Sequence, residues 1–195
     1  MDEVNPSEQI QSEDMSEKRS PHRSASMPAS SAMPEFLSQY IEVSKRVLLS
    51  PNLFFSEMKL EGGLKEPAVY LAISAAGHAL LSAVMKFKPL SIPSDFTFEL
   101  VAGFLIAGVA YFLGTAMGAK SSYEATFKVI AYTSCVRILA ALPGIGALVP
   151  LWSLVLHFLG LRKVLGLNPV QIVSIMVMSS LLMAVLQLAK FFHLF

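Results

Sequence analysis

The chain has 195 residues, of which 54% are hydrophobic and 15% are charged, with a net charge of +1 at neutral pH and a mean hydropathy of +0.58. So small a net charge gives no global basic field for nucleic acid. The single cysteine, Cys135, excludes an internal disulfide and a cysteine-based metal site. We therefore expect no nucleic-acid partner and no cofactor.

The first 33 residues differ in composition from the rest of the chain. Residues 1–33 are rich in Ser and Pro, carry six acidic side chains and contain no apolar core. Such a segment cannot bury enough apolar surface to fold alone, and it lacks the pattern of a secretory signal. We expect a disordered cytoplasmic tail.

Residues 34–66 have the pattern of an amphipathic juxtamembrane segment. Apolar side chains recur at helical spacing from Phe36 to Leu48, while the charged side chains fall largely elsewhere on the helical wheel. Ser50-Pro51 ends this predicted helix, because proline disfavours helix in the residue before it. The helix either lies in the plane of the membrane interface or docks on the membrane domain, and the pattern favours neither.

Residues 67–195 form the predicted membrane domain. Four runs in it contain no Asp, Glu, Lys or Arg, and a bilayer needs about 20 apolar residues per helix. The fold class expected is an all-α, polytopic membrane helical bundle of about five transmembrane helices plus the N-terminal amphipathic interfacial helix. The five segments are roughly 67–85, 98–118, 125–142, 144–161 and 170–188. The third contains Lys128 and Arg137, and four helices remain if it does not span.

The distribution of basic residues predicts the orientation. With five spans, eleven of the fifteen Lys and Arg residues lie on the side of the N-terminus and three on the opposite side. Because cytoplasmic loops are enriched in Lys and Arg, we expect a cytoplasmic N-terminus and an external C-terminus. The expected location is the cell membrane of a bacterium, as a multi-pass protein, or an endomembrane if the chain is eukaryotic.

Arg137 is the unusual residue within the apolar runs. A mid-helix arginine costs about 2.5–3.5 kcal/mol on insertion scales. It either snorkels toward the external turn or pairs inside the bundle, and Glu99 begins the second segment on the same external side. We predict that Glu99 and Arg137 meet. With His78, they form the candidate intramembrane polar site.

Other features of the apolar segments indicate packing and no enzyme. Ala110, Gly114 and Gly118 repeat every fourth residue, which lets helix backbones approach closely. His78 and His157 lie in different segments. They are expected to be neutral and hydrogen-bonded, with a proton relay or metal pair as the alternative. No catalytic or phosphate-binding motif is present.

The stretch from Ala131 to Leu167, AYTSCVRILAALPGIGALVPLWSLVLHFLGLRKVLGL, resembles the bacterial branch of the YIP family, the Ypt/Rab-interacting membrane proteins. Further similarities are Pro51 followed by Phe54-Phe55 and the Pro67-x-x-Tyr70 sequence. The resemblance implies five membrane helices with a cytoplasmic N-terminal region. Such proteins often have a proline shortly after the Ala-Tyr step. Here Val136 and Arg137 take that place, which puts a helix kink there in doubt.

Two hypotheses for function follow. The first is a non-enzymatic protein that organises membrane lipids or partner proteins, including a second copy of itself. The second is a small transporter or lipid-handling protein, in which Arg137, Glu99 and His78 line a polar path. Eukaryotic YIP members contact prenylated small GTPases, but nothing in the tail independently suggests that activity here. A continuous water-accessible cavity at Arg137 would favour transport. An Arg137 sealed against Glu99 would favour the first hypothesis.

Overall fold

The structure, a computed structural model, describes residues 29–192. The chain divides into two units, residues 1–36 and 37–195, and the described part of the first is the beginning of helix α1 (Ala29–Leu49). The predicted tail, residues 1–33, therefore lies mostly outside the described residues, and its last five residues are helical. All contacts below belong to the second unit.

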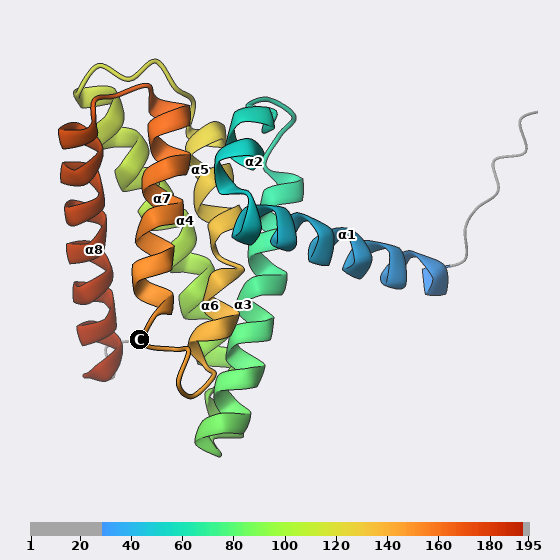
Figure 1. The fold of residues 1–195 in the computed structure, drawn as a ribbon. Helices are drawn as coiled ribbons and strands as arrows, with labels where there is room; N and C mark the ends of the chain where they lie inside the picture. The colour runs from blue at the N-terminus through green and yellow to red at the C-terminus, as the bar shows by residue number, and fades with distance from the viewer. Residues whose placement is uncertain (1–28, 193–195) are drawn as a thin grey trace, which may run out of the picture. The chain divides into compact units, whose positions relative to one another are not determined.

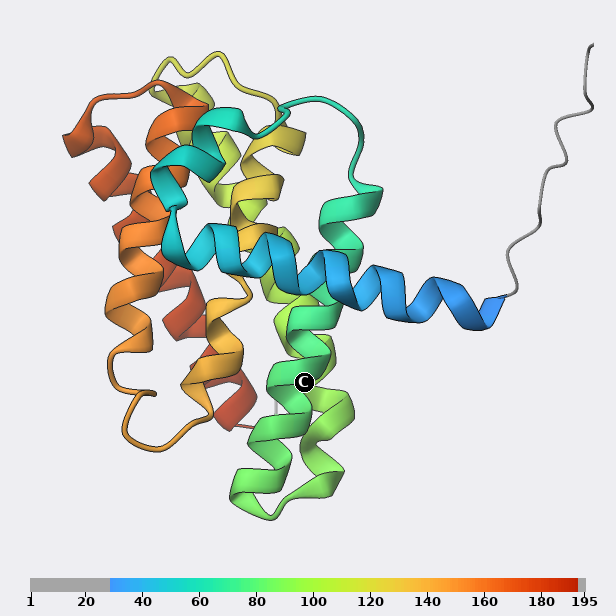
Figure 2. The same cartoon turned by 45° about the vertical axis from the view of Figure 1, so that its right-hand side comes forward.

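The described residues form helices and no strands, which confirms the all-α prediction. After α1 come α2 (Pro51–Glu57), α3 (Lys65–Lys86), the 3-10 turn η2 (Pro89–Ser91), α4 (Ile92–Ala116), α5 (Tyr123–Thr133), α6 (Val136–Ala140), α7 (Val149–Leu165) and α8 (Pro169–Phe191). Figures 1 and 2 show α3, α4, α7, α8 and the successive α5 and α6 running side by side as a bundle.

Two apolar cores hold the bundle together. One lies among α3, α4 and α5 around Leu71, Ile106 and Phe127. The other joins α2, α5, α7 and α8 and includes the fully buried Leu156 and Ile172. Many large apolar side chains on the outside of the bundle remain exposed, which is the pattern expected where lipid tails rather than water surround the helices.

Among the described residues, three helices are long and apolar enough to cross a membrane: Lys65–Lys86, Pro89–Ala116 and Pro169–Lys190. They overlap the first, second and fifth predicted segments. The fourth segment corresponds to α7, which is shorter at 17 residues. Asn168 caps the start of α8: its side chain accepts the N–H of Gln171, and the Gln171 side chain accepts the N–H of Asn168.

The third predicted segment, residues 125–142, is broken into two helices. α5 ends at Thr133 and α6 begins at Val136, although no proline lies between them. The side chains of Thr133, Ser134 and Cys135 each bond to a main-chain carbonyl three or four residues earlier, at 2.6–3.3 Å. Main-chain N–H groups across the break bond three residues back at 3.0–3.3 Å, as in a 3-10 helix. The helix therefore breaks at this point even though the chain lacks the proline that YIP-family sequences often have there.

The part of α1 from Leu37 onward crosses the bundle and packs against it (Figure 2). The Tyr40 hydroxyl lies 3.0 Å from Ser74 Oγ, and Ser44 Oγ lies 2.6 Å from the Tyr70 hydroxyl of α3. Burial raises the pKa of Tyr40, so its hydroxyl stays protonated. Leu37 and Ile41 of α1 are nevertheless about half exposed. The helix thus docks on the bundle and leaves some of its apolar side chains uncovered.

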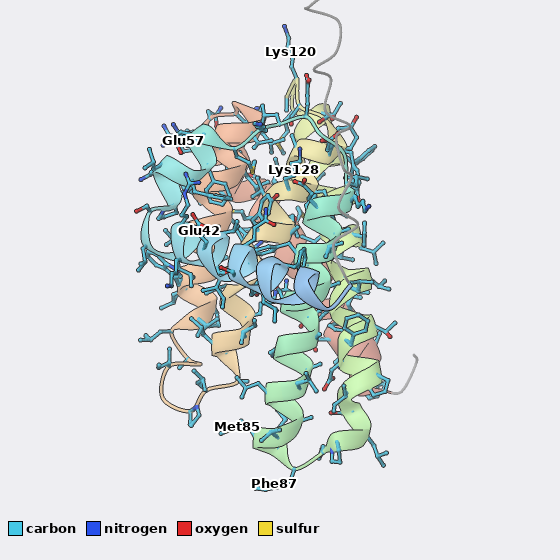
Figure 3. All side chains as sticks on the ribbon, turned by 90° about the vertical axis from the view of Figure 1, so that its right-hand side faces the viewer. Glu42, Glu57, Met85, Phe87, Lys120 and Lys128 are labelled. Atoms are coloured by element: carbon cyan, nitrogen blue, oxygen red, sulfur yellow. The ribbon has the colours of Figure 1, made fainter. Side chains whose placement is uncertain are left out.

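The two ends of the bundle are distinct. Figure 3 places Lys120, Lys128 and Glu57 toward one end, and Met85 and Phe87 at the opposite end. We refer to them as the Lys120 end and the Phe87 end.

Candidate intramembrane polar site

Glu99 is the centre of a buried polar cluster. It lies in α4, seven residues after the first residue of that helix, or about 10 Å along the axis. Only 7% of the residue is exposed. Its Oε2 accepts a hydrogen bond from Arg137 Nη1 of α6, and its Oε1 lies 3.5 Å from His78 Nδ1 of α3. The structure thus brings together the three residues that the sequence proposed, one from each of three helices.

The pairing determines how Arg137 is accommodated. Its guanidinium is bonded inside the bundle to a carboxylate of opposite charge, so it does not depend on snorkelling to the surface. Each partner of such a buried pair depends on the other. Removal of either one leaves an uncompensated buried charge, which lowers the stability of the fold by about 3–5 kcal/mol. Gly77 allows α6 to come close to α3, because a Cβ at that position would lie 3.0 Å from Ile138 Cδ1.

Arg137 also borders a partly open pocket of about 130 Å³ that residues of α4, α5, α7 and α8 line with it. His157, Ser153 and Ser179 contribute polar groups to its wall. His157 Nδ1 lies 2.7 Å from the Ser153 carbonyl oxygen, and its Nε2 lies 3.1 Å from Thr133 Oγ1. His157 is therefore a hydrogen-bonded core histidine whose partners differ from those of His78. The pocket has room for a few water molecules beside the guanidinium.

A second ion pair lies one turn earlier on α4. Asp95 Oδ1 accepts a hydrogen bond from Lys190 Nζ of α8, and this ammonium lies 4.8 Å from the centroid of the Phe98 ring. Asp95 and Glu99 are four residues apart and share one face of α4. Through them α4 bonds to α8 and α6, and Glu99 also approaches His78 of α3.

Lys128 has a structural role that its place in an apolar segment did not indicate. The residue is 5% exposed, and its Nζ donates three hydrogen bonds at 2.8–3.0 Å. Two go to the main-chain oxygens of Lys59 and Glu61, and one goes to Glu124 Oε1. All three ammonium protons are therefore used. The i, i+4 spacing of Glu124 and Lys128 was the available sequence signal.

The loop between α2 and α3, residues 58–64, is shaped to meet Lys128. Gly62 and Gly63 have φ values of +122° and +89°, which favour glycine. The Gly63 N–H donates to Glu124 Oε1 at 2.6 Å. The two hydrogen bonds from Lys128 and Gly63 hold the pKa of the Glu124 carboxyl below its usual value of 4.5.

Of the three small residues predicted to form a helix-packing face, Ala110, Gly114 and Gly118, only the first two lie in a helix contact. Ala110 and Gly114 are buried, and a Cβ at Gly114 would lie 3.1 Å from Leu165 Cδ2 of α7. Gly118 follows the end of α4 with φ +94° and open space around it, so its assignment to helix packing is wrong. It is a turn residue, for which positive φ rather than small size is the requirement.

The closest helix approaches lie at two other glycines. A Cβ at Gly103 would lie 2.7 Å from Leu71 Cδ2, between α4 and α3. A Cβ at Gly160 would lie 2.5 Å from Val129 Cγ1, between α7 and α5. The sequence analysis singled out neither residue. Gly160 has no small residue four positions away on α7, whereas Gly103 and Ala107 share the four-residue spacing of small residues, which was the available signal.

This arrangement of helices can be compared with known families. The family model of the Yip1 domain matches residues 45–191, about three quarters of the chain. The chain belongs to the YIP family. Comparisons with curated proteins and with solved structures found no match. The match covers α2 to α8, so the Glu99 cluster and the Lys128 contacts both lie within the YIP-family region. With its three helices long enough to span a bilayer, this YIP-family chain is a membrane protein.

Proposed function

We propose that this protein is a non-enzymatic, multi-pass membrane protein that organises membrane lipids or partner proteins. The observation that carries the proposal is the pairing of Arg137 with Glu99, with His78 on the second carboxylate oxygen. Polar groups that bond one another across helices stabilise a bundle. A role in carrying a solute would instead favour charged groups directed toward an open path.

The outer surface supports the same role. Leu37 and Ile41 on α1 are about half exposed, and Leu49 and Leu53 near the start of α2 are more so. An apolar helix face next to charged residues such as Lys45 is suited to the membrane interface. Lipids of that interface, a second copy of the chain or another membrane protein are the partners proposed for it.

The charge distribution supports a cytoplasmic Lys120 end in the cell membrane. Arg162 and Lys163 occupy the last turn of α7, which runs from the Phe87 end toward the Lys120 end. Lys86 and Lys88 flank the turn at the opposite end. The positive-inside tendency of membrane proteins then directs the N-terminus to the cytoplasm.

Transport or lipid handling is the second candidate. The pocket of about 130 Å³ beside Arg137 favours it, because His157 and Ser179 add polar groups to the same wall. Ser179 Oγ is buried and has no hydrogen-bond partner among the described residues. An unbonded hydroxyl of this kind is suited to a water molecule or a polar solute.

Reconstitution separates the two candidates. Full-length protein and an Arg137→Leu/Glu99→Leu double variant are placed in liposomes, and scrambling of fluorescent phospholipid and ion flux are measured. Organisation of lipids or partners predicts rates equal to protein-free liposomes for both proteins. It also predicts that spin-labelled phospholipids show a motionally restricted fraction or that differently tagged copies co-purify. Scrambling or flux that the double variant loses would overturn the proposal in favour of transport.

A further inference from the structure

A second pocket, at the Lys120 end, is unrelated to the Glu99 cluster. It has a volume of about 390 Å³ and is bounded by α1, α2, the 58–64 loop, α3 and α5. Ligand pockets in proteins fall mainly between about 300 and 1,000 Å³. The Lys128 contacts hold the loop wall in place, since Nζ bonds to two of its main-chain oxygens. The pocket is thus a formed feature of the fold.

The pocket has an aromatic wall. Phe54 and Tyr132 meet edge to face with ring centroids 5.4 Å apart, and Met58 lies beside them. The Arg46 guanidinium lies 5.9 Å from the Phe54 ring centroid, at the rim. Aromatic faces attract cations, most strongly where water is partly excluded.

Charges of both signs surround this wall. Arg46 uses one of its donors for Glu57 Oε2 at 2.6 Å and retains others. Glu61 and Glu66 also line the pocket, and neither carboxylate has an ion-pair partner among residues 29–192. The lining of the pocket therefore includes both a guanidinium and two carboxylates without ion-pair partners among the described residues.

This charge pattern selects the ligand. An anion alone would meet the carboxylates of Glu57, Glu61 and Glu66, and a cation alone would meet Arg46 and Lys59. A ligand that carries a phosphate and an amine satisfies both sets, because guanidinium binds phosphate and carboxylates bind ammonium through charge-assisted hydrogen bonds. A primary ammonium donates three hydrogen bonds, whereas a quaternary ammonium donates none. Two acceptor carboxylates thus favour the primary amine.

The position of the pocket indicates the source of such a ligand. Glu66 is the second residue of α3, one of the three helices long enough to cross a bilayer. The ends of spanning helices lie at the level of the lipid headgroups. We infer that this pocket binds the phosphoethanolamine headgroup of a phospholipid, with Arg46 on the phosphate and Glu61 and Glu66 on the ammonium. The inference specifies the lipid for the proposed organising role and rests on it.

The test uses full-length protein in a maltoside detergent, which carries no charge. Short-chain phosphatidylethanolamine is titrated against wild type, Arg46→Gln and Glu66→Gln, with Glu42→Gln as a matched control on an exposed position of α1 outside the pocket (Figure 3). Saturable binding is expected. Each pocket variant should weaken it by at least ~10-fold, the worth of one charge-assisted hydrogen bond, and the control should not. Circular dichroism and thermal unfolding verify that every variant folds.

Further arms identify the ligand and its source. Short-chain phosphatidylcholine, inorganic phosphate and ethanolamine should each bind more weakly than phosphatidylethanolamine. Equal binding of phosphate or ethanolamine alone would overturn the zwitterionic ligand. Equal binding of phosphatidylcholine would overturn the choice of a primary amine. If glycerophosphoethanolamine binds as tightly as the lipid, the membrane is not the source.

The absence of saturable lipid binding, or binding that neither pocket variant weakens, would overturn the site itself. The liposome measurements of scrambling and flux do not involve this pocket, so the proposed function and this inference can fail separately.

Discussion

Glu99 and Arg137 are 38 residues apart in the chain and form an ion pair between α4 and α6. The pair exists because α5 stops at Thr133 and a separate short helix carries Arg137 toward α4. His78 of α3 approaches the other carboxylate oxygen of Glu99, so one carboxylate joins three helices. A charge that would oppose membrane insertion on an isolated helix thereby becomes a link within the bundle.

Replacement of Arg137 alone is expected to destabilise the fold strongly. Arg137→Leu leaves the buried Glu99 carboxylate without its cation and should lower the free energy of unfolding by about 3–5 kcal/mol. The Arg137→Leu/Glu99→Leu double variant removes both charges and should recover most of this loss. Reversible unfolding in mixed micelles measures both. A single variant as stable as wild type would mean that the pair contributes nothing to the fold.

Two glycines in helices should respond oppositely to alanine. Gly160→Ala places a Cβ 2.5 Å from Val129 Cγ1, and overpacking of this kind costs about 1–3 kcal/mol. Gly108→Ala in α4 is the matched control, because a Cβ there meets nothing within 4 Å. It should be neutral or stabilising by up to about 1 kcal/mol, since alanine favours helix. Thermal unfolding in detergent compares them, and equal melting temperatures would contradict close packing at Gly160.

Loss of Lys128 should release the 58–64 loop. Lys128→Met keeps the length of the side chain but removes three hydrogen bonds. One bond to a charged group is worth about 1.5–3 kcal/mol, so amide exchange in the loop should accelerate at least ~10-fold. Lys120→Met is the control, because Lys120 is exposed. Hydrogen exchange with mass spectrometry would contradict the anchor if the two variants gave the same loop protection.

The same anchor should depend on pH. The pKa of Glu124 is lower in the folded protein than its usual 4.5, so the charged carboxylate favours the attached loop. Its contribution is present above about pH 4.5 and is lost as the pH falls through the lowered folded value. Loop protection should therefore decrease on acidification below that pH. In Glu124→Gln, which cannot ionise, protection should be weaker at neutral pH and change less on acidification.

Cysteine labelling tests the orientation. Lys88→Cys lies at the turn of the Phe87 end and Lys120→Cys at the opposite end, and both positions are exposed. In intact cells an impermeant maleimide should label Lys88→Cys, and it should reach Lys120→Cys only after permeabilisation. The native Cys135 is 4% exposed, so the unsubstituted protein is the blank. The reverse pattern would place the N-terminus outside.

The sequence predicts an apolar helix well where one local property, such as the absence of charge or a helix-start signal, sets its bounds. α3 extends across the charge-free run from Pro67 to Met85, and α8 begins where Asn168 and Pro169 predict a helix start. The break at Ser134 was not readable. The Ser134 side chain bonds to a main-chain carbonyl, and such a bond is only slightly more or less favourable than the regular helix. The packing of α6 beside Gly77 also helps to place the break.

The polar site shows the same division. Glu99 and Arg137 were predicted to meet because each is a charge near the same end of an apolar segment. The contact of His78 depends on the rotation of α3 about its axis, which the sequence does not determine. The partners of Lys128 depend on a loop whose path requires positive φ at Gly62 and Gly63, and no local pattern indicates which carbonyls that path presents.

Lys128 holds the 58–64 loop by hydrogen bonds to main-chain oxygens, which constrains the side chains of the loop very little. The side chains of Lys59 and Glu61 take no part in this attachment, because Lys128 bonds only to their main-chain carbonyl groups. Substitutions at these two positions can alter the charge of the pocket lining while the attachment persists. A substitution at Lys128 has no such freedom. One buried amine therefore separates the part of this region that must stay constant from the part that can diversify.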